Sequence, residues 1–159
     1  MHFIMMTKFS LVAMGGTFDI LHKGHLALLD EAFSISDNVI IGLASDEFAN
    51  KRGKKLNHNY SQRSEALKQL IEKKFQHKSY TISKLDSDFG PAVTEGNVQA
   101  LVVSDETAHK GDTLNKMRKE KNLDPVKTVV VPMILAQDGK RISTARIRNS
   151  EIDTQGNLV

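Results

Sequence analysis

Residues 15–25 read Gly15-Gly16-Thr17-Phe18-Asp19-Ile20-Leu21-His22-Lys23-Gly24-His25. They follow an apolar run with the pattern of a strand, residues 9–14, and they open a segment with helical spacing, residues 24–33. The two adjacent glycines allow a sharp turn, and the start of a helix offers unpaired amides and a positive dipole end that suit phosphate. The glycine spacing matches neither a Walker A loop nor a dinucleotide-binding GxGxxG. The stretch therefore predicts a phosphate-binding turn between a strand and a helix.

Two histidines, His22 and His25, flank Gly24 at this predicted helix start. Imidazole N–H groups can donate to phosphate oxygens, and Gly24 removes a side chain where a nucleotide would press on the backbone. A single histidine at a helix start is more often an ordinary surface residue, but the pair together with the glycines indicates a functional site. Asp19 fits two roles equally well: a side chain that fixes the turn, or a group that touches the ligand.

Apolar, β-rich runs alternate with segments of helical spacing along the whole chain. The predicted strands are residues 9–14, 39–44, 80–85, 100–104 and 127–131. The predicted helices are residues 24–33, a segment capped by Ser61, residues 110–121 and a short helix from about Ser143. Residues 45–60 are predicted as a polar, basic loop, and residues 86–99 carry no predicted element. Repeated βα units imply an α/β protein with a Rossmann-like, doubly wound parallel sheet in three α/β/α layers.

The composition fits one intracellular domain. The chain has 159 residues, of which 40% are hydrophobic and 26% charged, so we expect a single domain over residues 1–159. It contains no cysteine, which excludes thiol nucleophiles, Fe–S clusters and cysteine-ligated zinc. A formal charge of +3 with 6% aromatic residues gives no reason to expect a nucleic-acid partner, and no segment has the apolar length of a membrane span. We expect a cytoplasmic protein.

Three predicted strand ends are unusual in composition: residues 15–25, 45–63 and 104–118. Doubly wound sheets bind ligands at the carboxyl ends of their strands, so these segments are the candidate site. The second segment carries a basic run, Lys51 to Lys55, with a glycine inside it. Such a run is either a solvated loop or a mobile loop that closes over a substrate, and the two interpretations are equally supported.

Residues 15–25 resemble the HxGH signature of the nucleotidyltransferase superfamily, which includes cytidylyltransferases and phosphopantetheine adenylyltransferases. A second stretch, Ile142 to Arg148, is similar to the superfamily's distal ISSTxxR-type motif, although Thr144-Ala145 stands where Ser-Thr is common. The whole chain looks most like the archaeal and eukaryotic type of phosphopantetheine adenylyltransferase, although Asp105 stands where archaeal members often have Pro. The segments that carry this closer match are residues 42–47, 60–63 and 102–107, Asn115, Arg118, and residues 151–153 and 156–158.

The resemblance implies the nucleotidyltransferase fold and transfer of an adenylyl group from ATP to 4′-phosphopantetheine in coenzyme A biosynthesis, with Mg²⁺ held mainly by the ATP phosphates. It implies that His25 and His22 are catalytic, with Lys55, preferred over Lys54, as the cation of the basic loop. The nucleotide-binding residues that it implies are Gly15, Gly16, Thr17, Phe18, His22, Gly24, His25, Ser143, Thr144 and Arg146. The implied acceptor-binding residues are Thr17, Lys54, Lys55, Arg63 and Arg118, and no protein ligand for a metal is implied.

Other interpretations stay open on the sequence alone. The same scaffold resembles glycerol-3-phosphate cytidylyltransferases and flavin or nicotinamide mononucleotide adenylyltransferases, which differ in substrate and share the mechanism. A nucleotide sensor that binds ATP without turnover is the alternative from another class. Arg118 lies in a charged predicted helix, where a solvent-facing ion pair is slightly favoured over an acceptor contact.

Overall fold

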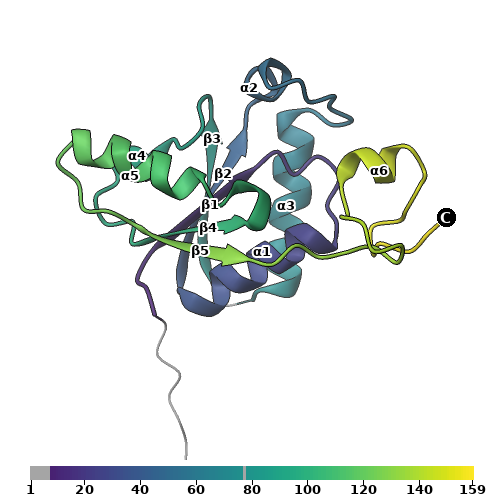
Figure 1. Cartoon of the computed structure of the whole chain (residues 1–159), viewed down its shortest axis with the longest axis horizontal. Helices are drawn as coiled ribbons and strands as arrows, with labels where there is room; N and C mark the ends of the chain where they lie inside the picture. The colour runs from purple at the N-terminus through teal and green to yellow at the C-terminus, as the bar shows by residue number, and fades with distance from the viewer. Residues whose placement is uncertain (1–7, 77) are drawn as a thin grey trace, which may run out of the picture.

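Five parallel strands form one sheet in the order β3-β2-β1-β4-β5 (Figure 1). A computed structural model describes residues 8–76 and 78–159; residues 1–7 and His77 of the predicted single domain lie outside the described residues. The strands are β1 (Val12–Gly16), β2 (Asn38–Ala44), β3 (Ser79–Leu85), β4 (Ala100–Ser104) and β5 (Lys127–Val131). The chain runs outward from β1 to β3 and then returns to β4 on the other side of β1. The carboxyl ends of β1 and β4 therefore form the switch point where such sheets bind ligands.

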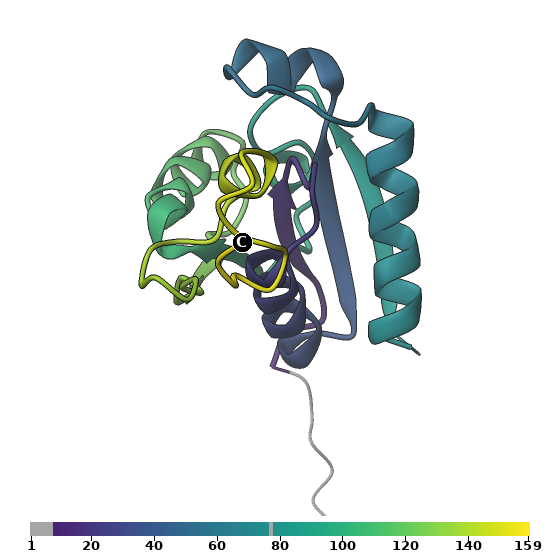
Figure 2. The same cartoon turned by 90° about the vertical axis from the view of Figure 1, so that its right-hand side faces the viewer.

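Helices cover both faces of this sheet, as Figure 2 shows edge-on. On one face, α1 (Lys23–Ile35) and α3 (Tyr60–Lys74) supply the apolar side chains, and on the other face α4 (Pro91–Thr94) and α5 (Lys110–Glu120) do so. Successive strand residues point to opposite faces, so Val12 and Met14 of β1 pack with α1 while Ala13 packs in the second cluster. The predicted doubly wound sheet in three layers is confirmed.

Helix caps account for the places where the predicted and the observed helices differ. The predicted cap Ser61 lies inside α3, because Asn59 accepts from the Gln62 amide while the Gln62 side chain accepts from the Asn59 amide. In the same way Ser45 caps α2 (Asp46–Lys51), within residues predicted as a loop. The Gly90-Pro91 pair lies within residues 86–99, for which no element was predicted, and it starts α4 with proline in the first turn.

The last segment of the chain, residues 132–159, packs beside the start of α1 and contains one short helix, α6 (Thr144–Arg148). Its own small core consists of Ala136, Ile142 and Ile152. It is fastened to the turn before α1, because the Lys23 amide donates to the Thr154 carbonyl at 3.0 Å and the Thr144 hydroxyl donates to the Ile20 carbonyl at 3.4 Å. These contacts bring the two predicted motifs together. Across the described residues, no helix has the length and apolar character to span a membrane.

Candidate active site

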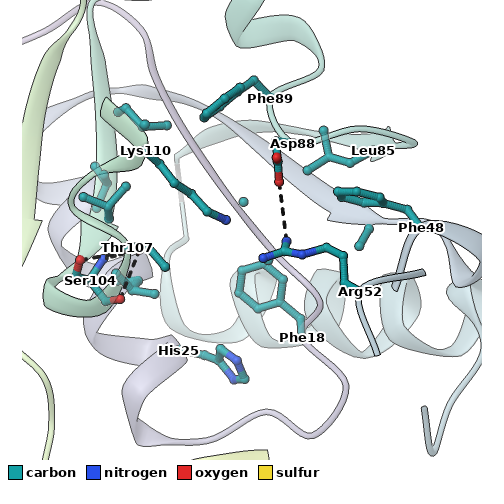
Figure 3. A pocket seen from close by; sticks show the side chains of 17 residues that line it. Phe18, His25, Phe48, Arg52, Leu85, Asp88, Phe89, Ser104, Thr107 and Lys110 are labelled. Atoms are coloured by element: carbon teal, nitrogen blue, oxygen red, sulfur yellow. Dashed lines mark hydrogen bonds and ion pairs between the residues drawn. The ribbon is translucent and has the colours of Figure 1, made fainter. Parts of the chain in front are cut away.

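Three hollows adjoin at the carboxyl ends of β1 and β4, and His25 lies in the wall of each. The apolar pocket lies between β1, β4 and α2 and is lined by Phe18, His25, Leu28, Phe48, Leu85, Phe89 and Leu101 among others (Figure 3). The polar cavity, of about 660 Å³, is lined by Thr17, His22, His25, Lys54, Lys55, Ser143, Thr144, Arg146 and Arg148 among others. The side pocket is lined by His22, Gly24, His25, Ile142 and residues 131–134 among others. A group held by His25 can therefore be reached from three directions.

The two histidines are fixed by the backbone of their own turn. His22 caps α1, because its Nδ1 accepts from the Gly24 amide at 3.1 Å. His25 completes the capping box, because its Nδ1 accepts from the His22 amide at 3.2 Å, and the two rings stack with centroids 3.8 Å apart. A nitrogen that accepts from an amide carries no proton, so in each neutral ring the proton is on Nε2. Both histidines thus hold an Nε2–H donor at fixed positions at the start of α1.

Burial keeps this histidine pair neutral. It lowers the pKa of His25 from 6.5 to about 3, with a further contribution from His22. It also lowers the pKa of His22, to about 4, where the charge of Arg141 acts in the same direction. Protonation would also remove the Nδ1 acceptors that close the capping box. At neutral pH the pair therefore consists of two uncharged hydrogen-bond donors.

Close packing around the pair explains the glycines of the turn. A Cβ atom on Gly24 would lie 2.9 Å from Cε1 of His22, so Gly24 makes room for the His22 ring. Gly24 also lines the side pocket, and its contact with a nucleotide stays a prediction. A Cβ atom on Gly16 would lie 3.0 Å from the Phe18 ring, which is buried and lies 4.9 Å from the His25 ring. Phe18 itself has a φ of 50°. The residues of this turn hold the imidazoles in place through contacts within the chain.

The basic loop is tied to the turn by Asp19. Both carboxylate oxygens of this buried residue are occupied, since they accept from the Asn57 amide at 2.8 Å and from the His58 amide at 2.9 Å. Of the two roles considered for Asp19, its contacts match the one that fixes the turn. Lys54 and Lys55 line the polar cavity, whereas Lys51 pairs with Glu47 on the exposed surface of α2.

The distal motif reaches the polar cavity through α6. Ser143 caps this helix by accepting from the Arg146 amide at 3.2 Å. The Arg146 guanidinium lies at the cavity, but its donors are taken by Asp138, Glu151 and the Arg141 carbonyl. Two carboxylates thus compensate the charge that the sequence assigned to the phosphates of a nucleotide.

Two arginines that sequence reasoning missed also line the polar cavity. Arg148 donates to the Lys55 carbonyl at 2.6 Å and to Asn57 Oδ1 at 2.7 Å, so it joins α6 to the basic loop. Arg141 pairs with Glu106 at 2.8 Å and borders both the cavity and the side pocket. Arg148 stood inside the motif stretch, which was a usable signal, but no spacing pointed to Arg141.

The structure contradicts the expectation that Arg118 binds the acceptor. Its side chain is completely buried, and it donates to the backbone carbonyls of Asp124, Ala92, Glu95, Gly96 and Val98. Arg118 therefore ties the segment that connects β3 with β4 to helix α5. It neither contacts the acceptor nor forms an ion pair at the surface.

Arg63 is likewise buried, and it lines none of the three hollows. Its guanidinium donates to the carbonyls of His58, Thr17 and Ala44 and pairs with Asp46 at 2.7 Å. These contacts support the turn from behind, so the structure corrects the expectation that Arg63 touches the acceptor.

The side chains at the site offer no cage for a metal ion. Among the described residues, no group of three or more histidine, aspartate or glutamate side chains could hold a cation. Asp19, the acidic side chain among the described residues that line the polar cavity, is already engaged by two backbone amides. A divalent ion at this site would have to arrive with oxygen ligands of its own, such as the phosphates of a nucleotide.

Comparison with known proteins matches the chain to one family. Residues 13–150 match the model of the family described as cytidylyltransferase-like. The chain is 39% identical over 155 residues to phosphopantetheine adenylyltransferase of Methanothermobacter thermautotrophicus, covering 98% of this chain and 93% of the relative. It is 38% identical over 163 residues to the enzyme of the same name from Pyrococcus furiosus, covering 98% and 97%. A crystal structure of a protein of unknown function from Archaeoglobus fulgidus superposes with a TM-score of 0.68 at 30% identity, covering 77% of this chain and 89% of that one.

Proposed function

The chain belongs to the cytidylyltransferase-like family, and from this premise we propose that it is a phosphopantetheine adenylyltransferase. It transfers AMP from ATP to 4′-phosphopantetheine and releases pyrophosphate, a step of coenzyme A biosynthesis. The observation that carries the proposal is the position of His25, which borders an apolar pocket, a polar cavity and a side pocket at once. Transfer between two bound substrates requires such a point, where the acceptor meets the reacting phosphate.

The reaction needs no general base. A phosphate monoester has a second pKa near 6, so the acceptor is largely a dianion at neutral pH. One of its oxygens forms a bond to the α-phosphorus of ATP, and the bond from that phosphorus to the bridging oxygen breaks, so pyrophosphate carries the electron pair away. Catalysis then consists of positioning the two phosphates and stabilising the charge that develops.

His25 and His22 supply this stabilisation as neutral donors. Their Nδ1 atoms are bound to the backbone, so the Nε2–H groups are the ones free to donate to oxygens of the α-phosphate. The donors are fixed before substrate binds, so no reorganisation is needed at the moment of transfer. A single fixed donor of this kind contributes about 100- to 1000-fold to kcat in comparable sites.

The polar cavity holds the triphosphate. Its cations Lys54, Lys55, Arg141 and Arg148, together with Thr17, Ser143 and Thr144, line the space where the β- and γ-phosphates would lie. The resemblance implied that Lys54, Lys55 and Thr17 bind the acceptor, and we place them beside the triphosphate instead. Mg²⁺ bound to phosphate oxygens and water would neutralise part of the charge on the leaving pyrophosphate. Arg148 holds the Lys55 carbonyl, so α6 and the basic loop form one phosphate-binding wall.

The apolar pocket suits the acceptor. Its leucine, phenylalanine and valine side chains offer an apolar wall to the pantetheine arm, and His25 stands at its end. The side pocket, with Val131, Pro132 and Ile134, offers an apolar surface for the base of the nucleotide on the other side of His25.

The cytoplasmic location and the single domain over residues 1–159 stay predictions.

The test is pyrophosphate release with Mg²⁺, crossing ATP and CTP against 4′-phosphopantetheine, glycerol 3-phosphate, flavin mononucleotide and nicotinamide mononucleotide. We expect turnover with ATP and 4′-phosphopantetheine. His25→Asn is the control, because Asn Oδ1 can replace Nδ1 as the acceptor of the His22 amide but provides no donor at the Nε2 position. Turnover with another pair would replace the acceptor assignment, and ATP binding without any turnover would favour a sensor.

A further inference from the structure

The apolar pocket contains two cations that the proposed mechanism does not use, Arg52 and Lys110, and only Arg52 has an acidic partner. Lys110, the first residue of α5, is half-buried and lines the pocket together with His25, Ser104 and Thr107. In Figure 3 its ammonium group points into the pocket from one side, the Arg52 guanidinium points inward from the other, and His25 lies on a third wall. Lys54 and Lys55 line only the polar cavity, so Lys110 serves a different part of the site.

The charged side chains that line the apolar pocket carry one more positive charge than negative charge. The ionisable side chains in its wall, apart from the neutral His25, are Arg52, Asp88 and Lys110. Asp88 pairs with Arg52 at 3.7 Å, and Arg52 also lies over the Phe48 ring. Within the described residues, the ammonium group of Lys110 has no hydrogen-bond or ion-pair partner. Burial, followed by the charges of Arg52 and Lys54, lowers the pKa of Lys110, while the charge of Asp88 acts in the opposite direction. An anion bound in the pocket would compensate the charge of the half-buried ammonium.

The start of α5 is held firmly enough to aim this side chain. Gly111 packs directly on β5, because a Cβ atom at this position would meet Thr128 Oγ1 and Cβ. Asn115, one turn further on, exchanges two hydrogen bonds with the Val126 backbone, at 3.0 and 2.8 Å. The backbone of Lys110 is thus fixed against the sheet, and its long side chain extends toward the centre of the pocket.

We propose that Lys110 is a specificity-determining residue for the acceptor: its ammonium binds the acceptor's phosphate monoester in the apolar pocket beside His25. This inference rests on the proposed function, in which a phosphorylated pantetheine arm occupies that pocket. A phosphate dianion supplies the missing negative charge, and a lysine ammonium binds phosphate as a point charge. The same arm without its phosphate would leave the half-buried ammonium of Lys110 unpaired, so the enzyme would bind it more weakly.

The experiment measures binding of 4′-phosphopantetheine and of pantetheine by calorimetry to the wild type and to Lys110→Met, with kcat and KM for the acceptor beside it. We expect the wild-type preference for the phosphorylated ligand to fall about 10- to 100-fold in Lys110→Met, the loss of one charge-assisted contact. Binding of pantetheine should stay within about twofold. Lys116→Met removes the same charge from an exposed position of the same helix and should keep the preference. Lys110→Arg should keep most of it.

Each other result contradicts the inference in a distinguishable way. Wild-type turnover with an unchanged preference in Lys110→Met overturns the role of Lys110 and leaves the proposed function standing. An equal loss of affinity for both ligands shows that Lys110 contacts the arm and overturns the phosphate contact. Wild-type protein that binds no 4′-phosphopantetheine and releases no pyrophosphate overturns the proposed function and this inference together.

Discussion

Acidification is a direct probe of the neutral histidine pair. In the folded protein His22 and His25 stay uncharged well below pH 6.5, whereas in the unfolded chain both take up a proton near that value. Between these limits the unfolded state binds more protons, so the free energy of unfolding rises with pH. The stabilisation from the lowered pKa values is fully present above pH 6.5 and is lost as pH falls toward about 4 and about 3.

The size of the effect follows from the two pKa values. At pH 5 an unfolded histidine with a pKa of 6.5 is almost fully protonated, while folded groups with pKa values of about 4 and about 3 are almost fully neutral. Between pH 7 and pH 5 the free energy of unfolding therefore falls by about 2 kcal/mol for each histidine and by about 4 kcal/mol for the pair. A domain is typically stable by about 5–15 kcal/mol, so the loss is easily measured.

Urea denaturation at pH 7 and pH 5, for the wild type and for His25→Asn, isolates this contribution. Asparagine does not titrate in this range and can still accept from the His22 amide, so the capping box is kept. We expect the loss of stability between the two pH values to be about 2 kcal/mol smaller in the variant. An equal loss in both proteins would refute the neutral state of His25 and with it the mechanism by neutral donors.

Three other residues give separate predictions. Arg118→Met leaves buried carbonyls without donors, so the free energy of unfolding measured in urea should fall by at least about 3 kcal/mol. The kcat of the folded protein should be unchanged, and a loss of stability below about 1 kcal/mol would contradict the structural role of Arg118. Asp19→Ala removes the acceptor of the Asn57 amide, so hydrogen exchange there should accelerate about tenfold or more, and an unchanged rate would argue against the tie. Lys55→Ala should lower kcat/KM for ATP about tenfold or more, whereas Lys51→Ala should change it less than about twofold; equal small effects would make the basic loop a solvated one.

The strands were predictable because their side chains alternate or run apolar without interruption. The predicted bounds of β4 and β5 are those observed, and the turn between β1 and α1 falls within residues 15–25 as expected. The bounds of β1 differ from the predicted residues 9–14, since the strand begins at Val12 and includes Gly15 and Gly16. Local pattern alone could not reveal α2, because six residues in a polar, basic stretch become helical only through the Ser45 cap and burial of Ala49.

The arginines show the limit of reading a site from sequence. Arg63, Arg118 and Arg146 have the charge that a phosphate site needs, but carbonyls and carboxylates take up their donors. For Arg63 and Arg118 several of these partners lie far away in the sequence. Lys110 and Arg148 do line the hollows, Arg148 with the carboxylate of Asp19 at 3.8 Å, and the place of both depends on how α5 and α6 pack. Which charge remains uncompensated is a property of the tertiary structure, and no spacing in the sequence encodes it.

The central claim is that the chain moves an adenylyl group between two substrates that meet at His25. The most direct measurement uses ATP labelled at the α-phosphorus with unlabelled 4′-phosphopantetheine, followed by mass analysis of the labelled product. The account predicts that the label appears in dephospho-coenzyme A in step with pyrophosphate release, and that His25→Asn slows both about 100- to 1000-fold. Label that stays in ADP or AMP without entering the acceptor, or labelling that His25→Asn leaves unchanged, would contradict it.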